Sequence, residues 1–345
     1  MKKKICIIYT GGTIGMIPSG NGYVPSGQDF REFFPSIPDL LKPGMPDLEV
    51  IQFDPLLDSS NIAVREWNRI GRTIAENYDS FDGFVILHGT DTMSYSASAL
   101  SFMLENLDKP VIFTGSQIPL CEIRSDGAAN LVSAVLIAAE AKVREVCIYF
   151  DGRLLRGCRS TKASSDRFTA FDSPNEENLA EVGIHISYRR NKNRPPADGP
   201  FHLMEFEQVP VGIIKIFPGI QFEMFESIMT EQYKGVVLET FGAGNIPASS
   251  SGGLIPIIEK AYRNGTLIIV CSQCMQGTVS LGAYETSKAL QDIGAVTGGD
   301  MTTEAAMTKL IYLFSRHEPV DRIRSLMMKN LRGELSEITG PGAGQ

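Results

Sequence analysis

Two loops early in the chain each follow an apolar run and contain glycine and threonine. Thr13 lies in the loop 9–15, Tyr-Thr-Gly-Gly-Thr-Ile-Gly, and Thr90 lies in the loop 88–92, His-Gly-Thr-Asp-Thr. The glycines allow sharp turns and bring backbone N–H groups close to a ligand, while each threonine hydroxyl could attack a carbonyl or bind one. Two such loops, each at the end of an expected strand, indicate one site that contains both threonines.

The residue types around these loops suit metal-free cleavage of an amide or ester. That reaction requires a nucleophile, a base for its proton and donors for the developing oxyanion. The segment 16–28 is rich in glycine and proline, and we interpret it as a mobile lid that carries a tyrosine. With this tyrosine as the proton partner of the first threonine and a lysine completing a relay, the candidate catalytic residues are Thr13, Tyr23, Thr90, Asp91 and Lys162.

Motifs of other enzyme classes are missing or incomplete. The sequence has no Gly-x-Ser-x-Gly, His-Glu-x-x-His or Gly-x-x-x-x-Gly-Lys motif. The run 242–247 has proline where a dinucleotide-binding loop has its third glycine, and Cys271 and Cys274 form one C-x-x-C pair without the other ligands of a closed zinc site. His88 ends a buried strand, so we interpret it as a packing residue outside the catalytic set. We therefore expect neither a metal nor an organic cofactor.

Composition restricts the class of protein further. The 345 residues, 43% of them hydrophobic, are enough for about two domains. A net charge of −8 without a Lys/Arg cluster argues against a nucleic-acid partner. No apolar run approaches the ~18 residues of a membrane helix, and the apolar run at 5–8 ends too early for a signal peptide. The six cysteines lie mostly in or beside expected strands and are expected to be reduced, which indicates a cytoplasmic protein.

The first half of the chain alternates β-rich runs with helical ones, which predicts a parallel sheet covered on both faces. Its expected strands lie near 3–9, 48–53, 83–88, 109–114 and 145–150, and its helices near 63–79, 94–107 and 126–142. A capping box formed by Ser173 and Glu176 predicts one further short helix. Ligands of such sheets collect beyond the carboxyl ends of the strands, where both threonine loops lie.

A basic, proline-rich segment predicts a linker, which we place at 189–209. It separates a catalytic α/β domain, 1–188, from a second and smaller α/β domain, 210–345. In the second domain the expected strands lie near 210–216, 235–239 and 266–271, and the helices near 221–231, 253–263, 282–293, 303–316 and 320–331.

Several motifs together resemble the bacterial-type L-asparaginases. They are the two threonine loops, Asp58-Ser59-Ser60, Lys162, and the segments 100–106, 114–119, 241–245 and 330–334, so the resemblance covers nearly the whole chain. Without an expected signal peptide, the chain looks like the cytoplasmic type I branch. The resemblance implies an asparaginase-like fold with a larger, flavodoxin-like N-terminal domain, and homodimers that often pair into tetramers with active sites between subunits.

The same resemblance implies a role for each site residue. Thr13 is the nucleophile and Tyr23 its lid partner, while a second triad of Thr90, Asp91 and Lys162 assists proton transfer or activates water. The residues that should hold the substrate's α-carboxylate and α-ammonium are Asp58, Ser59, Ser60, Thr90 and Asp91. Weaker site candidates are Asn245 and Tyr284, the latter at a position where the secreted branch takes an acidic residue from a neighbouring subunit.

One position departs from the type I pattern. Some type I enzymes bind asparagine at an activating site that uses an arginine just before the 241–245 stretch, where this chain has Glu239. An acidic side chain would repel the effector's carboxylate, so we expect homotropic activation to be weak or absent. Thr161 and Cys274, at other positions of that site, are retained.

The sequence thus predicts an L-asparagine amidohydrolase that forms aspartate and ammonia through a threonine acyl-enzyme. Minor activity on glutamine is compatible with this, because one methylene changes binding by only ~1–3 kcal/mol. Direct activation of water by Thr90 and Lys162 stays open as a second mechanism.

Three other functions are weaker readings of the same residues. An ammonia-supplying subunit of a tRNA-dependent amidotransferase would usually carry an extra amino-terminal domain and a basic surface that faces the tRNA. The sequence indicates neither. A non-catalytic amino-acid sensor would not need a paired nucleophile and base. A lysophospholipid hydrolase would be expected to carry an amphipathic, membrane-facing stretch, which is not evident.

Overall fold

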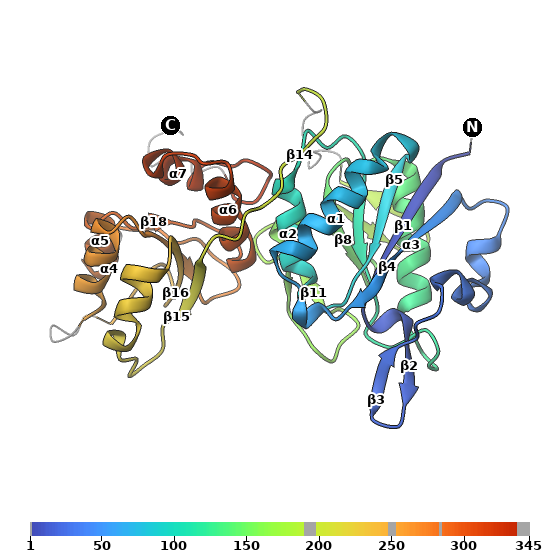
Figure 1. Cartoon of the computed structure of the whole chain (residues 1–345), viewed down its shortest axis with the longest axis horizontal. Coiled ribbons are helices and arrows are strands. Elements are labelled where there is room, and N and C mark those ends of the chain that lie inside the picture. The colour runs from blue at the N-terminus through green and yellow to red at the C-terminus, as the bar shows by residue number, and fades with distance from the viewer. Residues whose placement is uncertain (1, 190–197, 248–252, 283–284, 337–345) are drawn as a thin grey trace. The chain divides into compact units, whose positions relative to one another are not determined.

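The structure, a computed structural model, describes residues 2–189, 198–247, 253–282 and 285–336. The chain divides into two compact units, Met1–Glu205 and Phe206–Gln345. Each unit has its own sheet (Figure 1) and its own hydrophobic core. This arrangement confirms the predicted α/β class with a larger N-terminal sheet and a smaller C-terminal one.

An eight-stranded sheet forms the centre of the N-terminal unit, in the order β13-β12-β9-β8-β7-β5-β1-β4. Its strands are β1 (Lys4–Gly11), β4 (Asp47–Leu57), β5 (Gly83–Leu87), β7 (Val111–Thr114), β8 (Val146–Phe150), β9 (Arg153–Arg156), β12 (Ala180–Val182) and β13 (Ile186–Tyr188). The five strands from β4 to β8 in this order are parallel, as predicted. Their carboxyl ends therefore lie at one edge of the sheet, where the two threonine loops begin.

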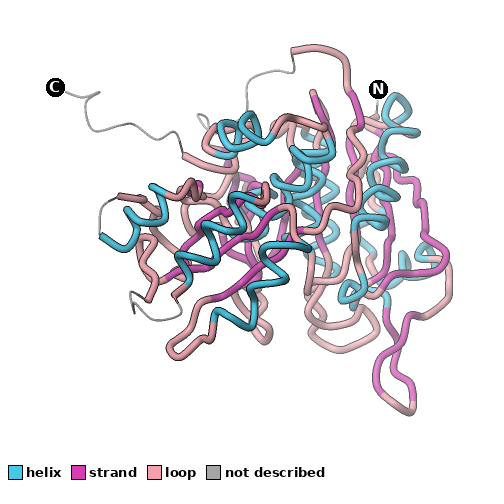
Figure 2. Tube along the Cα trace, turned by 60° about the vertical axis from the view of Figure 1, so that its left-hand side comes forward, coloured by secondary structure: helices cyan, strands magenta, loops and turns pink. Residues whose placement is uncertain are grey.

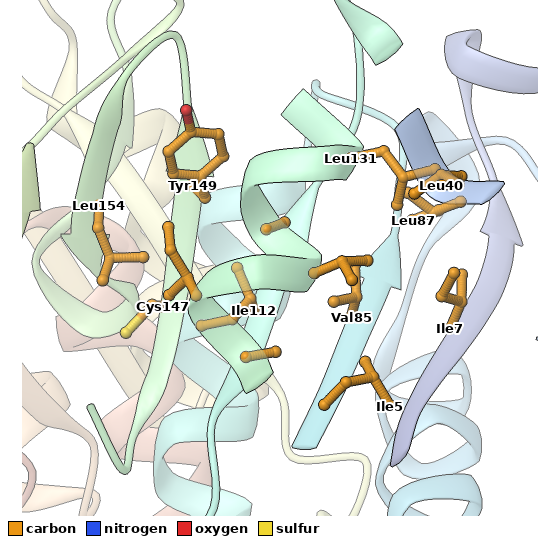
Figure 3. Close-up of a cluster of buried hydrophobic side chains, with 14 of the residues drawn as sticks. Ile5, Ile7, Leu40, Val85, Leu87, Ile112, Leu131, Cys147, Tyr149 and Leu154 are labelled. Carbon is orange, nitrogen blue, oxygen red and sulfur yellow. The ribbon is translucent and has the colours of Figure 1, made fainter. Parts of the chain in front are cut away.

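Helices cover this sheet because its central strands are apolar on both faces. Every residue of β5, β7 and β8 is buried. On one face α3 (Gly127–Glu140) contributes Leu131 to a cluster with Ile7, Val85 and Ile112 (Figure 3). On the other face lie α1 (Val64–Glu76) and α2 (Met93–Met103), which are joined by a hydrogen bond of 3.0 Å from the Trp67 indole to the Ser96 hydroxyl (Figure 1).

One edge of the sheet is antiparallel, which the sequence analysis did not predict. The strands β9, β12 and β13 pair antiparallel with β8, β9 and β12, respectively. The short helix predicted after Ser173 is wrong, because this stretch leads into β12 instead. Asp172 accepts the Ser173 N–H at 2.9 Å, and the Glu176 carboxylate is directed to the buried guanidinium groups of Arg156 and Arg159.

The predicted lid, 16–28, folds mainly as a β-hairpin. The strands β2 (Met16–Ser19) and β3 (Gly22–Pro25) pair antiparallel and extend away from the large sheet (Figure 2). Half of the Tyr23 side chain is exposed on β3. The hairpin directly follows the turn that carries Thr13, so its base is fixed beside the first threonine loop.

A four-stranded parallel sheet, ordered β15-β16-β17-β18, forms the centre of the C-terminal unit. Its elements are β15 (Val211–Lys215), β16 (Gly235–Thr240), β17 (Leu267–Ser272), β18 (Val296–Thr297), α4 (Leu254–Arg263), α5 (Glu285–Asp292), α6 (Thr303–Ser315) and α7 (Val320–Met327). The three predicted strands are confirmed, whereas β18 was missed because it has only two residues. The helix predicted at 221–231 is replaced by a 3-10 turn, Phe222–Phe225, and a π turn, Ile228–Gln232.

The predicted linker, 189–209, is described only in part, because 190–197 lie outside the described residues. Within it, β14 (His202–Leu203) pairs with β6 (Leu104–Glu105), so these residues belong to the N-terminal unit. The exact domain limits stay a prediction.

Candidate active site

Three loops meet where glycines let their backbones come close together. A Cβ atom on Gly12 would lie 2.5 Å from the backbone N of Gly89, and one on Gly89 would lie 2.6 Å from the Cβ of Ser59. Gly12 also has φ of 90°, a conformation that other residues rarely adopt. Because only glycine fits at both positions, the loop with Thr13, the loop with Thr90 and the loop after β4 lie against one another.

Thr13 begins a 3-10 turn, Thr13–Gly15, just beyond the end of β1. Its side chain is partly buried. The Leu120 N–H donates to the Ile14 carbonyl at 3.1 Å, and the Ser26 N–H donates to the Gly15 carbonyl at 3.3 Å. The turn with Thr13 is therefore bonded both to the loop after β7 and to the base of the hairpin.

Lys162 joins the two polar residues of the second threonine loop. Its ammonium donates to Thr90 Oγ1 at 2.9 Å and to Asp91 Oδ1 at 2.7 Å. Thr90 is 7% exposed, while most of the Asp91 side chain faces solvent. Lys162 reaches them from β10 (Thr161–Lys162), which pairs with β11 (Phe171–Asp172). Residues more than 70 positions apart in the sequence thus form one hydrogen-bonded group.

The loop after β4 contributes three of the five residues predicted to bind substrate. Asp58 precedes a 3-10 turn, and its carboxylate accepts the Ser60 N–H at 2.9 Å. Ser59 is buried, and its carbonyl accepts a hydrogen bond of 2.7 Å from the Thr92 hydroxyl. This bond fastens the loop to the one that carries Thr90, and Asp58 and Ser60 on either side of Ser59 are exposed.

Tyr23 has a different partner from the one predicted. Its hydroxyl donates to Glu122 Oε1 at 3.0 Å, and this hydrogen bond raises the pKa of Tyr23. No hydrogen bond joins Tyr23 to Thr13, both of which are described. Glu122 lies in the loop after β7, whose Cys121 thiol donates to the Met16 carbonyl at 3.4 Å. The structure thus brings Tyr23 to this loop, and its catalytic role stays a prediction.

His88 behaves as the packing residue that the sequence analysis proposed. It is fully buried, its ring lies edge-on to Phe113 at 5.6 Å, and burial lowers its pKa to about 4. Its Nδ1 lies 2.7 Å from the Gly89 carbonyl, which can only accept, so Nδ1 carries the proton of the neutral ring. His88 therefore anchors the start of the loop with Thr90.

Gln117 is a site residue that the sequence analysis did not single out. Its Oε1 lies 3.3 Å from Thr90 Oγ1, and its backbone N–H donates to the Asp126 carboxylate at 3.0 Å. It follows β7, the strand beside β5, at the same sheet edge as the threonine loops. The position of a polar residue just after a third neighbouring strand was the signal that could have found it.

The remaining candidates belong to β10, to the C-terminal unit or to the residues outside the described ranges. Thr161 is next to Lys162 in β10, whereas Glu239, Cys274 and Asn245 belong to the C-terminal unit. Glu239 accepts a hydrogen bond of 2.7 Å from the Thr303 hydroxyl. Cys274 is exposed, and Asn245 exchanges two backbone hydrogen bonds with Phe241. Tyr284 lies outside the described residues.

The chemistry available at the site is that of hydroxyls, one lysine, carboxylates and an amide. Among the described residues, no group of three or more His, Cys, Asp and Glu side chains could hold a metal ion. Within the same residues, none of the helices has the length and apolar character to cross a membrane. The constellation suits acyl transfer from an amide to a hydroxyl.

Comparison with known families decides where the chain belongs. Residues 4–194 match the family model described as Asparaginase, N-terminal, and residues 210–327 match that of the Glutaminase/Asparaginase C-terminal domain. The chain belongs to the asparaginase family. The predicted resemblance is therefore confirmed.

Proteins with related sequences match 97% of the chain. L-asparaginase 1 of Escherichia coli (strain K12) is 45% identical over 97% of this chain and 98% of that protein. The crystal structure of L-asparaginase I from Vibrio cholerae has a TM-score of 0.89 and 42% identity over 97% of this chain and 100% of that one. The 60 kDa lysophospholipase of Mus musculus is 38% identical over 97% of this chain and 63% of that protein.

Proposed function

We propose that the protein hydrolyses L-asparagine to L-aspartate and ammonia. The observation that carries this proposal is the contact of Lys162 with Thr90 and Asp91, beside the turn that holds Thr13, in a member of the asparaginase family. A hydroxyl nucleophile and a separate proton-transfer group are what amide cleavage without a metal needs.

In the proposed mechanism, Thr13 Oγ1 attacks the side-chain carbonyl of the substrate. Its proton passes to the Tyr23 oxygen while Tyr23 passes its own proton to the Glu122 carboxylate, to which it is already directed, and both shifts reverse when the ester is cleaved. The C–N bond then breaks, the nitrogen takes a proton and leaves as ammonia, and an ester on Thr13 remains. Water attacks this ester, which releases aspartate and restores the hydroxyl. Thr90, with Lys162 and Asp91, supplies and recovers the protons of the two steps.

Substrate recognition is proposed to rest on the loop after β4 and on Asp91. Hydroxyls and backbone N–H groups at Ser59 and Ser60 suit an α-carboxylate, and the carboxylates of Asp58 and Asp91 suit an α-ammonium. The pocket would distinguish glutamine from asparagine by only ~1–3 kcal/mol for the extra methylene, so minor glutaminase activity is expected.

We further propose that the protein is cytoplasmic and forms a homodimer or a dimer of dimers. We also propose that asparagine activates it weakly or not at all. The Glu239 carboxylate already binds the Thr303 hydroxyl, and Lys215 lies 3.9 Å from its other oxygen. This negative charge opposes binding of a carboxylate effector. A sigmoidal dependence of rate on asparagine that becomes hyperbolic when Thr161 is changed would contradict the proposal.

The test is ammonia release from L-asparagine by the purified wild type, Thr13→Ala and Thr90→Ala, with L-glutamine and a lysophospholipid assayed in parallel. We expect robust asparagine turnover by the wild type and a rate about 10²–10⁴-fold lower in each variant. The circular dichroism of each variant should match that of the wild type, which shows that the variant is folded. A folded wild type that binds asparagine without turnover would favour a sensor. Preferential release of fatty acid would favour the activity named for the lysophospholipase relative.

A further inference from the structure

The hydrogen bonds around Thr90 determine where its hydroxyl proton points. A lysine ammonium has three donors and no acceptor, so Thr90 Oγ1 accepts the hydrogen bond from Lys162 at 2.9 Å. The Thr90 proton must therefore go to another group. Gln117 Oε1 lies 3.3 Å from Thr90 Oγ1 and accepts it. The order of donation runs from Lys162 to Thr90 and from Thr90 to Gln117.

The Gln117 amide is held so that its oxygen, and not its nitrogen, faces Thr90. Its Nε2 donates to two backbone carbonyls, those of Ser165 at 3.2 Å and Arg167 at 3.1 Å. A flipped amide would turn its oxygen toward these two carbonyls, which are acceptors only. The backbone of Gln117 is fixed in turn, since its N–H donates to both oxygens of Asp126 at 3.0 Å.

Resting on the proposed function, we propose that Gln117 is a positioning residue that fixes the Thr90 hydroxyl with its proton turned away from Lys162. In this orientation Lys162 meets Thr90 as a proton donor. When the C–N bond of the substrate breaks, the Thr90 O–H bond breaks and its proton goes to the departing nitrogen. A proton from Lys162 then forms the new Thr90 O–H bond, and the water that attacks the ester on Thr13 returns a proton to Lys162.

The length of the bond to Gln117 fits such a role. An ordinary O–H···O hydrogen bond measures about 2.7–2.8 Å, so a bond of 3.3 Å directs the Thr90 proton without holding it tightly. The proton can swing to the substrate nitrogen when that nitrogen arrives, while Lys162 and Asp91 keep their contacts. Gln117 acts on the reaction only through Thr90.

Two variants separate this role from that of a tether for the loop 163–170. Gln117→Met removes both the acceptor for Thr90 and the two donors to Ser165 and Arg167. Gln117→Glu also removes the donors but keeps a side-chain oxygen of the same reach as an acceptor for Thr90. A tether would be lost in both variants, whereas positioning of the hydroxyl would be lost only in Gln117→Met.

The experiment measures kcat and KM for asparagine, together with the three-bond couplings of Thr90 in enzyme labelled with ¹³C and ¹⁵N at threonine. In Gln117→Met we expect kcat to fall about tenfold, as for loss of one hydrogen bond, with KM changed by less than about threefold. The couplings should show several Thr90 rotamers. In Gln117→Glu we expect kcat several-fold higher than in Gln117→Met, and a single rotamer as in the wild type.

A matched control accounts for stability. Gln273 also donates from Nε2 to two backbone carbonyls, those of Ile216 and Glu239, but it lies in the C-terminal unit. The decrease in melting temperature caused by Gln273→Met measures how much a side-chain amide with two such hydrogen bonds contributes to stability when it is not part of the site. Equal losses of kcat in both Gln117 variants, or an unchanged Thr90 rotamer in Gln117→Met, would overturn the proposal. The couplings decide it even if the wild type fails to hydrolyse asparagine, an outcome that would refute only the proposed function.

Discussion

The hydroxyl groups of Thr13, Tyr23 and Thr90 differ in their hydrogen-bond partners. Thr90 lies between an ammonium donor and an amide acceptor, so both its lone pair and its proton have a defined partner. Tyr23 donates to Glu122, which leaves its oxygen able to accept. Thr13 begins the 3-10 turn Thr13–Gly15, just after β1. The difference in partners is what would let three hydroxyls take three roles in one reaction.

The contact between Tyr23 and Glu122 predicts a measurable pKa. A hydrogen bond to a carboxylate stabilises the protonated phenol, so the pKa of Tyr23 is raised in the wild type and should fall toward its usual value in Glu122→Gln. The measurement is a pH titration of the ¹³Cζ signals of labelled tyrosine, with Tyr23→Phe used for assignment. An unchanged Tyr23 titration in Glu122→Gln would show that the two side chains do not pair in solution.

The buried His88 predicts how stability depends on pH. Its pKa is about 4 in the folded chain and about 6.5 when unfolded, so between these values the unfolded state binds a proton that the folded state does not. Stability therefore falls as pH drops from about 6.5 to 4, by about 3 kcal/mol in total for this group.

The variant His88→Asn removes this titration and keeps an N–H near the Gly89 carbonyl. Denaturant unfolding at several pH values should give a shallower loss of stability between pH 6.5 and 4 than in the wild type. Equal slopes for the two proteins would mean that His88 does not stay neutral in the fold.

At the level of elements, parallel strands explain why distant loops converge. Because β1, β5 and β7 run in the same direction as neighbours, the loops with Thr13, Thr90 and Gln117 all begin at one edge. Close packing then needs positions without a side chain, which Gly12 and Gly89 supply. The loops are thus held by backbone contact, while their side chains stay free to carry out chemistry.

The variant Gly12→Ala tests this close approach. Its Cβ would lie 2.5 Å from the Gly89 backbone N, and φ at this position is 90°, so we expect a loss of about 1–3 kcal/mol in stability with a large loss of asparagine turnover. In the control Gly183→Ala, the added Cβ meets nothing within 4 Å, so stability and turnover should stay near the wild type. Thermal melting and ammonia release measure both effects. Wild-type turnover in a stable Gly12→Ala would show that the loops need not touch.

At the scale of the whole molecule, each unit is stabilised by its own core. The N-terminal cluster includes Ile7, Val85 and Leu131, and the C-terminal cluster includes Val236 and Ile268. The C-terminal unit also buries an ion pair completely, between Lys309 and Glu334. Lys309 donates to the Met327 and Lys329 carbonyls as well, which fastens the segment after α7 to α6.

Removing one partner of this ion pair should weaken the C-terminal unit in particular. Lys309→Met leaves the Glu334 carboxylate buried without its cation, which typically costs about 3–5 kcal/mol. Hydrogen exchange measured by mass spectrometry should show faster exchange in β15–β17, with β5 and β7 little changed. The double variant Lys309→Met, Glu334→Leu should recover part of the loss. Equal acceleration in both units would mean that they unfold as one.

The sequence by itself determined the parallel strands of the N-terminal sheet, the helices that cover it and the loops that bear the chemistry. Buried runs such as those of β1 and β5, each followed by glycine and threonine, carry a local signal, because strand burial and turn geometry depend on neighbouring residues. The helix after Ser173 was wrongly predicted because Glu176 faces Arg156 and Arg159, which no local pattern reveals. The antiparallel edge was missed because it depends on pairing between short strands that are separated in the sequence.

Only the tertiary structure decided which polar side chains meet. The contact of Lys162 with Thr90 was expected from the resemblance, whereas the bond of Tyr23 to Glu122, 99 positions away, and the bond of Thr90 to Gln117, in the loop after β7, were not. Such contacts depend on the order of strands in the sheet and on where short turns aim their side chains. Because those properties arise from packing of the whole unit, the identity of Gln117 as a partner of Thr90 emerges only when the chain is folded.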